Sequence, residues 1–77
     1  MAEPLIVDAR GHRCPVPTLR LRRALEAASP GTQVLLIADD PLARIDVPHF
    51  VAGLGATLVV VTDEVDGAIR FLVSKAL

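Results

Sequence analysis

The sequence contains one cysteine, no tryptophan, no tyrosine and only two phenylalanines in 77 residues. A single cysteine excludes an intramolecular disulfide, and two histidines beside it are too few and too poorly spaced for a zinc site. Eight basic residues are balanced by nine acidic ones, so the chain lacks the basic surface with stacking aromatics that is typical of nucleic-acid-binding domains. We therefore expect no metal and no direct contact with nucleic acid.

Long apolar runs are missing as well. No stretch approaches the roughly 20 apolar residues that are needed to span a bilayer, so we expect no membrane association. The first residues lack the charged segment, apolar core and cleavage site of a secretory signal. A free thiol without such a signal suits a reducing compartment, and we expect the protein in the cytoplasm.

Aliphatic side chains are what the sequence has in quantity, and 52% of its residues are hydrophobic. This composition suits one small domain, residues 1–77, with a two-layer core. The charge is uneven: residues 1–30 carry five arginines against three acidic residues, whereas residues 31–77 carry three basic residues against six acidic ones. The cysteine lies in the basic half, where the charge favours a thiolate and an acidic partner surface.

Residues 4–8, apolar and β-branched, predict a buried strand that ends at Asp8, and Cys14 lies between this strand and a helix-like run from Thr18 to Ala28. The first N–H groups of a helix lack partners within it and its dipole is positive there, so a thiolate at this place is stabilised and its pKa falls. Arg10, Arg13 and a protonated His12 act in the same direction.

Two prolines, Pro15 and Pro17, suit the first helical turn because their fixed φ fits a helix and their missing N–H would be unpaired anyway. They predict a rigid, positively charged support for the thiol of Cys14. The alternative is an ordinary buried cysteine that packs as a small hydrophobic residue.

The first helix, predicted from about Pro15 to Ala28, has one clear apolar stripe. Its members are Pro17, Leu21, Ala24, Leu25 and Ala28. Val16 and Leu19 lie outside that stripe, and the charges around them include Arg22 and Arg23. They are either ordinary exposed aliphatic residues or an apolar docking patch, rimmed by arginine, beside the thiol.

The rest of the chain predicts three more strands, 32–38, 56–62 and 69–75, and a second helix that ends at Gly55. In that helix we expect Asp46 as the cap, Pro48 in the first turn and a core face made of Val47, Phe50, Val51 and Leu54. Asp66-Gly67 predicts a hairpin between the last two strands.

This order predicts an α/β (α+β) two-layer sandwich, β-α-β-α-β-β, with a mixed four-stranded sheet and both helices packed on one face. The other face of the sheet stays open. The strands carry apolar residues of both parities, so this face could pair with another chain.

Asp39, Asp40 and Pro41 follow the second strand. An aspartate before proline is common in turns, so Asp39 and Asp40 are expected in turn and capping roles. The two carboxylates could also form a polar wall near Cys14, because both segments leave the carboxyl ends of adjacent parallel strands. His49 falls between core positions, and we expect it to face solvent.

The segment Gly11-x-x-Cys14-Pro15-x-Pro17, which follows Leu5-x-x-Asp8, resembles the Cys-Pro-x-Pro signature of the TusA/SirA-like family of small sulfur-carrier proteins. Four further landmarks fit the pattern of that family and extend the resemblance over nearly the whole chain: Pro30-Gly31, Ala38-Asp39-Asp40-Pro41, Asp46-x-Pro48-x-Phe50 and Asp66-Gly67.

The resemblance implies a sulfurtransferase in which Cys14 takes sulfur from a persulfide donor such as a cysteine desulfurase. Cys14 then carries the sulfur as a covalent persulfide, without another cofactor, to an acceptor protein. The pathway implied first is the 2-thiolation of the wobble uridine of certain tRNAs, with molybdenum-cofactor assembly, sulfur oxidation and selenium handling as others. The oligomeric state expected is a monomer or a weak homodimer. The alternative function is a regulatory adaptor in which Cys14 is a redox-sensing thiol.

Overall fold

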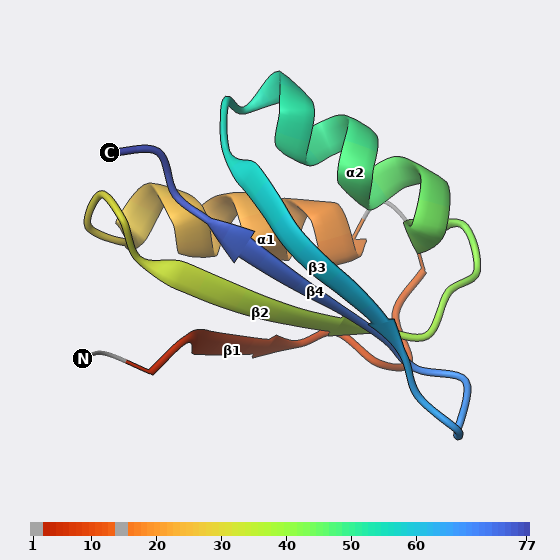
Figure 1. Ribbon diagram of the computed structural model, residues 1–77. Helices are drawn as coiled ribbons and strands as arrows, with labels where there is room; N and C mark the ends of the chain where they lie inside the picture. Colours follow the sequence, from red (N-terminus) through yellow and green to blue (C-terminus); the bar gives the residue numbers. More distant parts are fainter. Residues whose placement is uncertain (1–2, 14–15) are drawn as a thin grey trace.

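The computed structural model describes residues 3–13 and 16–77, arranged as a sheet covered by two helices (Figure 1). The elements are β1 Leu5–Asp8, α1 Val16–Ala27, β2 Gln33–Ala38, α2 Ala43–Gly53, β3 Thr57–Asp63 and β4 Ile69–Ser74. The predicted order β-α-β-α-β-β is confirmed, and the strand bounds lie within one residue of those expected.

The sheet is mixed and its strands lie in the order β1-β2-β4-β3. β1 and β2 pair in parallel, whereas β4 pairs antiparallel with both β2 and β3. The predicted hairpin joins β3 to β4, and its turn is closed by the Glu64 N–H, which donates to the Ala68 carbonyl at 2.9 Å. The parallel pair therefore brings the chain segments that leave β1 and β2 to the same edge of the sheet.

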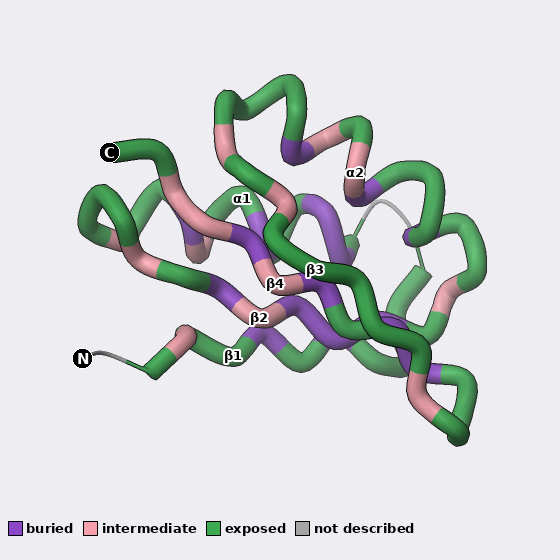
Figure 2. Tube along the Cα trace, in the orientation of Figure 1, coloured by how far each residue is buried: buried purple, intermediate pink, exposed green. Residues whose placement is uncertain are grey.

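The core lies between the sheet and the helices (Figure 2). Register and burial agree, since Leu36 of β2 lies beside Phe71 of β4 and both side chains are fully buried. The larger members of this core are Val7, Leu21, Leu25, Val34, Leu36, Val47, Val51, Ile69, Phe71 and Val73. Burial of these side chains, worth about 1.5–3 kcal/mol each, compensates for the small size of the domain.

The apolar stripe of α1 is largely as predicted. Pro17, Leu21 and Leu25 are buried, and Ala24 is half-buried. Thr18, which was not expected in the core, is buried as well. No helix in the described part of the chain has the length and the apolar character needed to cross a bilayer.

The prediction that Asp46 caps α2 is wrong, because the helix begins three residues earlier, at Ala43. Its N-cap position is Leu42, which provides no side-chain hydrogen bond. Asp40 organises this start: its Oδ1 accepts the Leu42 N–H at 3.0 Å, and its carbonyl accepts the Ala43 N–H at 2.9 Å. Asp46 lies in the first turn of the helix, and Pro48 lies inside the helix rather than at its beginning.

The core face of α2 is also narrower than predicted. Ala43, Val47 and Val51 are buried at a spacing of four residues, whereas Phe50 is half-buried and Leu54 is 39% exposed. Leu54 lies beyond the last helical residue, at the C-cap, so it leaves the line of the buried stripe. His49 is exposed, as expected.

β1 was expected to be a buried strand, and this is wrong. It is an edge strand in which Leu5 and Ile6 are 48% and 68% exposed. The register continues from Ile6 through Leu35 and Leu72 to Val60, which forms an apolar row across the sheet face opposite the helices. The expected open face is therefore present, and it is apolar along this row.

β3 forms the other edge of the sheet. Its residues Val59, Val60 and Val61 are each more than two-fifths exposed. A β-bulge interrupts its pairing with β4 between Leu58 and Val60, so Val59 is an extra residue in the outer strand.

Candidate functional site

The segment between β1 and α1 ends with the first half of the Cys-Pro-x-Pro sequence, and Val16 and Pro17, the second half, open α1. The segment leaves β1 in contact with β2, because the Ala9 N–H donates to the Ile37 carbonyl at 2.8 Å. The His12 N–H then donates to the Ala9 carbonyl at 3.2 Å, which closes a turn. On the far side of Cys14 the Val16 N–H donates to the Arg13 carbonyl at 2.9 Å, at the first residue of α1. Cys14 and Pro15 themselves lie outside the described residues.

Asp39 joins this segment to the end of β2. Both of its carboxylate oxygens accept the backbone N–H of Gly11, at 3.0 Å for Oδ1 and 3.1 Å for Oδ2. Gly11 has a φ of 83°, a conformation that side-chain-bearing residues rarely adopt. This contact links residues 28 positions apart in the sequence and holds the loop three residues before Cys14.

A shallow hollow lies where the two segments meet. Its lining consists of Gly11, His12, Arg13, Asp39, Asp40 and Pro41. The structure thus brings the carboxylates after β2 together with the histidine and arginine that precede Cys14. Asp40 also takes part in the turn that starts α2, so the pair Asp39 and Asp40 contributes both to that turn and to the lining of the hollow. Asp46 is not part of this lining.

Arg10 was expected to support the thiolate together with Arg13, but the structure pairs it with a carboxylate. Its Nε and Nη2 donate to the two oxygens of Asp8 at 2.9 and 2.8 Å. These hydrogen bonds lower the pKa of Asp8 from 3.8 to about 2. Arg10 lines a different hollow, beside Asp66 and Arg70. The charge of Arg10 is therefore compensated by Asp8, whereas Arg13 and His12 line the hollow where the two segments meet.

The outer face of α1 carries the residues predicted for partner docking. Val16 and Leu19 are 37% and 52% exposed, and they line one shallow depression together with Arg20 and Arg23. Arg20 is also tied to the sheet, since its Nη1 donates to the Asp8 carbonyl at 2.6 Å. This arrangement gives an apolar spot rimmed by arginine, beginning two residues after Cys14.

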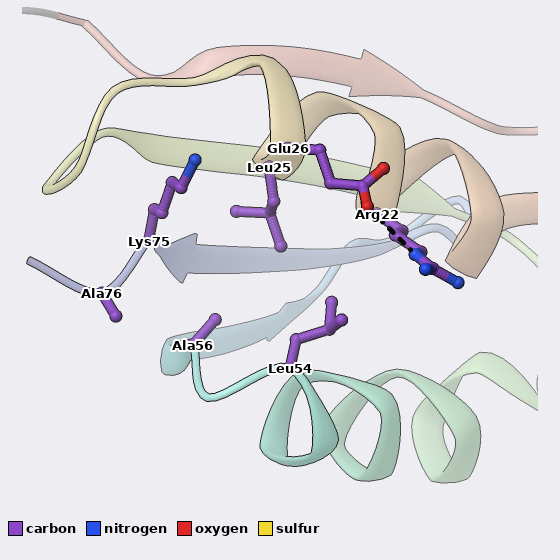
Figure 3. Close-up of a pocket in the computed structure, with 7 residues that line it drawn as sticks. All are labelled: Arg22, Leu25, Glu26, Leu54, Ala56, Lys75 and Ala76. Atoms are coloured by element: carbon purple, nitrogen blue, oxygen red, sulfur yellow. Dashed lines mark hydrogen bonds and ion pairs between the residues drawn. The ribbon is translucent and has the colours of Figure 1, made fainter.

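Arg22, the fourth residue predicted for docking, is separated from this depression. It lines an apolar hollow with Leu25 and Leu54, near the C-terminal tail (Figure 3). Its Nε pairs with Glu26 at 3.4 Å, one helical turn further along α1. The hollow lies toward the C-terminal half of α1, away from the segment that carries Cys14.

Comparisons with known proteins agree with the resemblance in the sequence. The family model described as Sulfurtransferase TusA matches residues 5–75. A protein of Archaeoglobus fulgidus, named as a candidate sulfur carrier protein, is 42% identical over 67 residues, which cover 87% of each chain. The crystal structure of a SirA-like protein from Desulfitobacterium hafniense superimposes with a TM-score of 0.83 at 24% identity, over 95% of this chain and 99% of that one. The match over nearly all of the sequence and the shared fold lead to one conclusion: this chain belongs to the TusA family of sulfurtransferases.

Proposed function

We propose that the chain is a sulfur carrier whose sulfur-accepting residue is Cys14. In the proposed step the Cys14 thiolate attacks the terminal sulfur of a cysteine persulfide on a donor protein. A bond forms between Sγ of Cys14 and that sulfur, while the S–S bond of the donor breaks and the donor cysteine leaves as a thiolate. Sulfur is exchanged without net oxidation, so the step needs no cofactor other than the persulfide itself.

The observation that carries this proposal is the place of the cysteine in the chain, between a loop anchored to β2 and the first residue of α1. At the start of α1 the Val16 N–H is already paired with the Arg13 carbonyl and Pro17 has no N–H, so the positive end of the helix dipole is the feature that favours an anion there. It favours the Cys14 thiolate before transfer and the persulfide anion after it. Arg13 and His12, which line the adjacent hollow, add positive charge when His12 is protonated.

A cysteine desulfurase is the donor that we propose, and a protein with an acceptor cysteine is the recipient. The apolar spot formed by Val16 and Leu19, with Arg20 and Arg23 around it, is the proposed docking surface for these partners. The near-neutral charge of the chain suits transfer between proteins rather than binding of RNA. Thiolation of the wobble uridine in tRNA is the pathway that we propose first, and the cytoplasm is the proposed compartment.

Intact-mass spectrometry tests the carrier function directly. After incubation with a cysteine desulfurase and cysteine, the chain should gain one sulfur, about 32 Da, which a thiol reductant removes. The variant Cys14→Ser should gain nothing. Oxidation of Cys14 to a sulfinic acid adds a similar mass but resists the reductant, so the two products are distinguished.

A redox-sensing adaptor would give a different result. It would oxidise at Cys14 when treated with peroxide but would acquire no reductant-labile sulfur from the desulfurase. That outcome would contradict the carrier proposal. The acceptor pathway is tested separately, by measuring thiolated uridine in the tRNA of cells that lack this chain and in cells complemented with Cys14→Ser.

A further inference from the structure

We propose that Asp39 is a positioning residue for sulfur transfer: it holds the loop before Cys14 through the backbone N–H of Gly11. This inference rests on the proposed role of Cys14 and adds a residue from a different part of the chain. Asp39 follows β2, whereas Gly11 follows β1, and their contact crosses the gap between two neighbouring parallel strands.

The geometry of the contact carries the argument. The Gly11 N–H is shared between both oxygens of Asp39, at 3.0 and 3.1 Å, and a hydrogen bond to a charged acceptor is stronger than one between neutral groups. The position of Asp39 is fixed independently, because Ala38 directly before it is fully buried and paired with Ile69 of β4. A rigid strand end therefore holds an exposed loop at one point.

The loop needs such an anchor because few of its own contacts order it. Gly11, His12 and Arg13 are all exposed, and they carry no side chains into the core. Among the described residues the segment is also tied to β2 at its first residue, where the Ala9 N–H donates to the Ile37 carbonyl, whereas the backbone hydrogen bonds from His12 to Ala9 and from Val16 to Arg13 are local. The Asp39 contact relates this segment to β2, and a shift of about 1 Å in a reacting group can slow a reaction by about 100-fold.

Asp39 could instead act through its charge alone, since a carboxylate near a thiolate disfavours the charged form. The two roles differ in their response to asparagine. Asp39→Asn removes the charge but keeps an oxygen that can accept the Gly11 N–H, whereas Asp39→Ala removes both. Positioning therefore predicts that Asn rescues the function that Ala loses, and a charge effect predicts equal behaviour of both variants.

The matched control is Asp63→Asn. Asp63 lies at the same edge of the sheet, across Ile69 from Ala38, and it is an exposed carboxylate that pairs with Arg44. It is not part of the lining of the hollow where the segments after β1 and β2 meet. This variant removes one negative charge and one surface ion pair from that edge while leaving Gly11 in contact with Asp39.

Three measurements on the full chain test the proposal. The first is hydrogen exchange of the Gly11 amide, which should speed up about tenfold or more in Asp39→Ala and stay near wild type in Asp39→Asn and Asp63→Asn. The second is the initial rate of sulfur uptake from the desulfurase, with an expected loss of about tenfold in Asp39→Ala and less than about twofold in the other two. The third is the rate of Cys14 alkylation by iodoacetamide as a function of pH. The pH dependence of this rate should differ between Asp39→Ala and Asp39→Asn.

The outcomes separate this proposal from the carrier function. If wild type accepts sulfur but both Asp39 variants behave alike in all three measurements, positioning by Asp39 is wrong and the carrier function stands. If Gly11 exchange and the alkylation profile respond as expected while wild type accepts no sulfur, the anchor is real and the carrier function is wrong. A drop in melting temperature shared by both Asp39 variants would assign Asp39 to overall stability and would overturn the proposal.

Discussion

The two strand-to-helix connections at the carboxyl edge of the parallel pair are built differently. The first, residues 9–15, is the longer and holds the cysteine; the second, residues 39–42, is short and folds into the turn Asp39-Asp40-Pro41 that begins α2. The two connections are joined by a hydrogen bond, which the Gly11 N–H of the first donates to the Asp39 carboxylate of the second. The difference teaches that the cysteine and a contact that orders its loop come from separate segments: Gly11, three residues before Cys14, is held by a side chain of the connection after β2.

The largest effect on sulfur uptake is expected from a substitution on the exposed face of α1, the helix that follows the first connection. Leu19→Asp on α1 should lower the rate of sulfur uptake from the donor protein by about tenfold, equivalent to about 1.4 kcal/mol, because a charge replaces an apolar contact in the proposed docking spot. Leu19 is half-exposed, so the melting temperature should stay near that of wild type.

The matched control for that variant lies on the other helix. Ile45→Asp on α2 changes a side chain that is 71% exposed, and it should leave uptake within about twofold of wild type. Equal losses in Leu19→Asp and Ile45→Asp would show that the outer face of α1 has no special part in docking.

A smaller effect is expected from glycine replacement. Gly11→Ala should lower the free energy of unfolding by about 1–2 kcal/mol, because a φ of 83° is strained for alanine although nothing lies within 4 Å of the added Cβ. Gly53→Ala, in α2 and without positive φ, should raise it by about 0.5 kcal/mol. Denaturant unfolding measures both free energies. If Gly53→Ala lowered the free energy of unfolding as much as Gly11→Ala does, the cost of Gly11→Ala could not be assigned to the loop conformation.

The smallest effect concerns the ion pair at the end of β1. The pKa of Asp8 is lowered from 3.8 to about 2, so its pair with Arg10 stabilises the fold above about pH 4 and is lost as the pH falls toward 2. The difference in unfolding free energy between wild type and Asp8→Asn should therefore shrink over that range. Arg10→Gln breaks the same pair and should give the same pH profile; a difference that stays constant down to pH 2 would contradict the assignment.

Most of the fold could be predicted because local patterns and topology rules agree. The strand patterns, the Asp66-Gly67 turn and the stripe Pro17, Leu21 and Leu25 of α1 all gave the observed elements. The start of α2 was misplaced because Asp46 and Pro48 form a typical helix-start pattern, and Asp40-Pro41 forms another three residues before the true beginning. Both aspartate-proline patterns are compatible with a helix start. In the structure the helix begins after Asp40, whose side chain and carbonyl accept the N–H groups of Leu42 and Ala43.

The site was predictable as far as its segments, and less so in its contacts. Parallel pairing placed Asp39 near the cysteine loop, but the sequence could not tell that its partner would be a backbone N–H, since every residue except proline carries one. Arg10 was assigned to the thiolate because it is close in sequence, yet its guanidinium pairs with Asp8, two residues earlier in the chain. Proximity in sequence says little about which way a side chain leaves an exposed loop.

The bulge in β3 has a consequence for how the chain behaves when concentrated. An edge strand with three exposed valines presents unpaired N–H and C=O groups with which a strand of another copy of the chain can pair. The extra residue Val59 splits that edge strand into two short pieces that are out of step with each other, so an incoming strand that matches one piece cannot continue along the next. The bulge at Val59 thus works against edge-to-edge pairing of copies of the chain through β3.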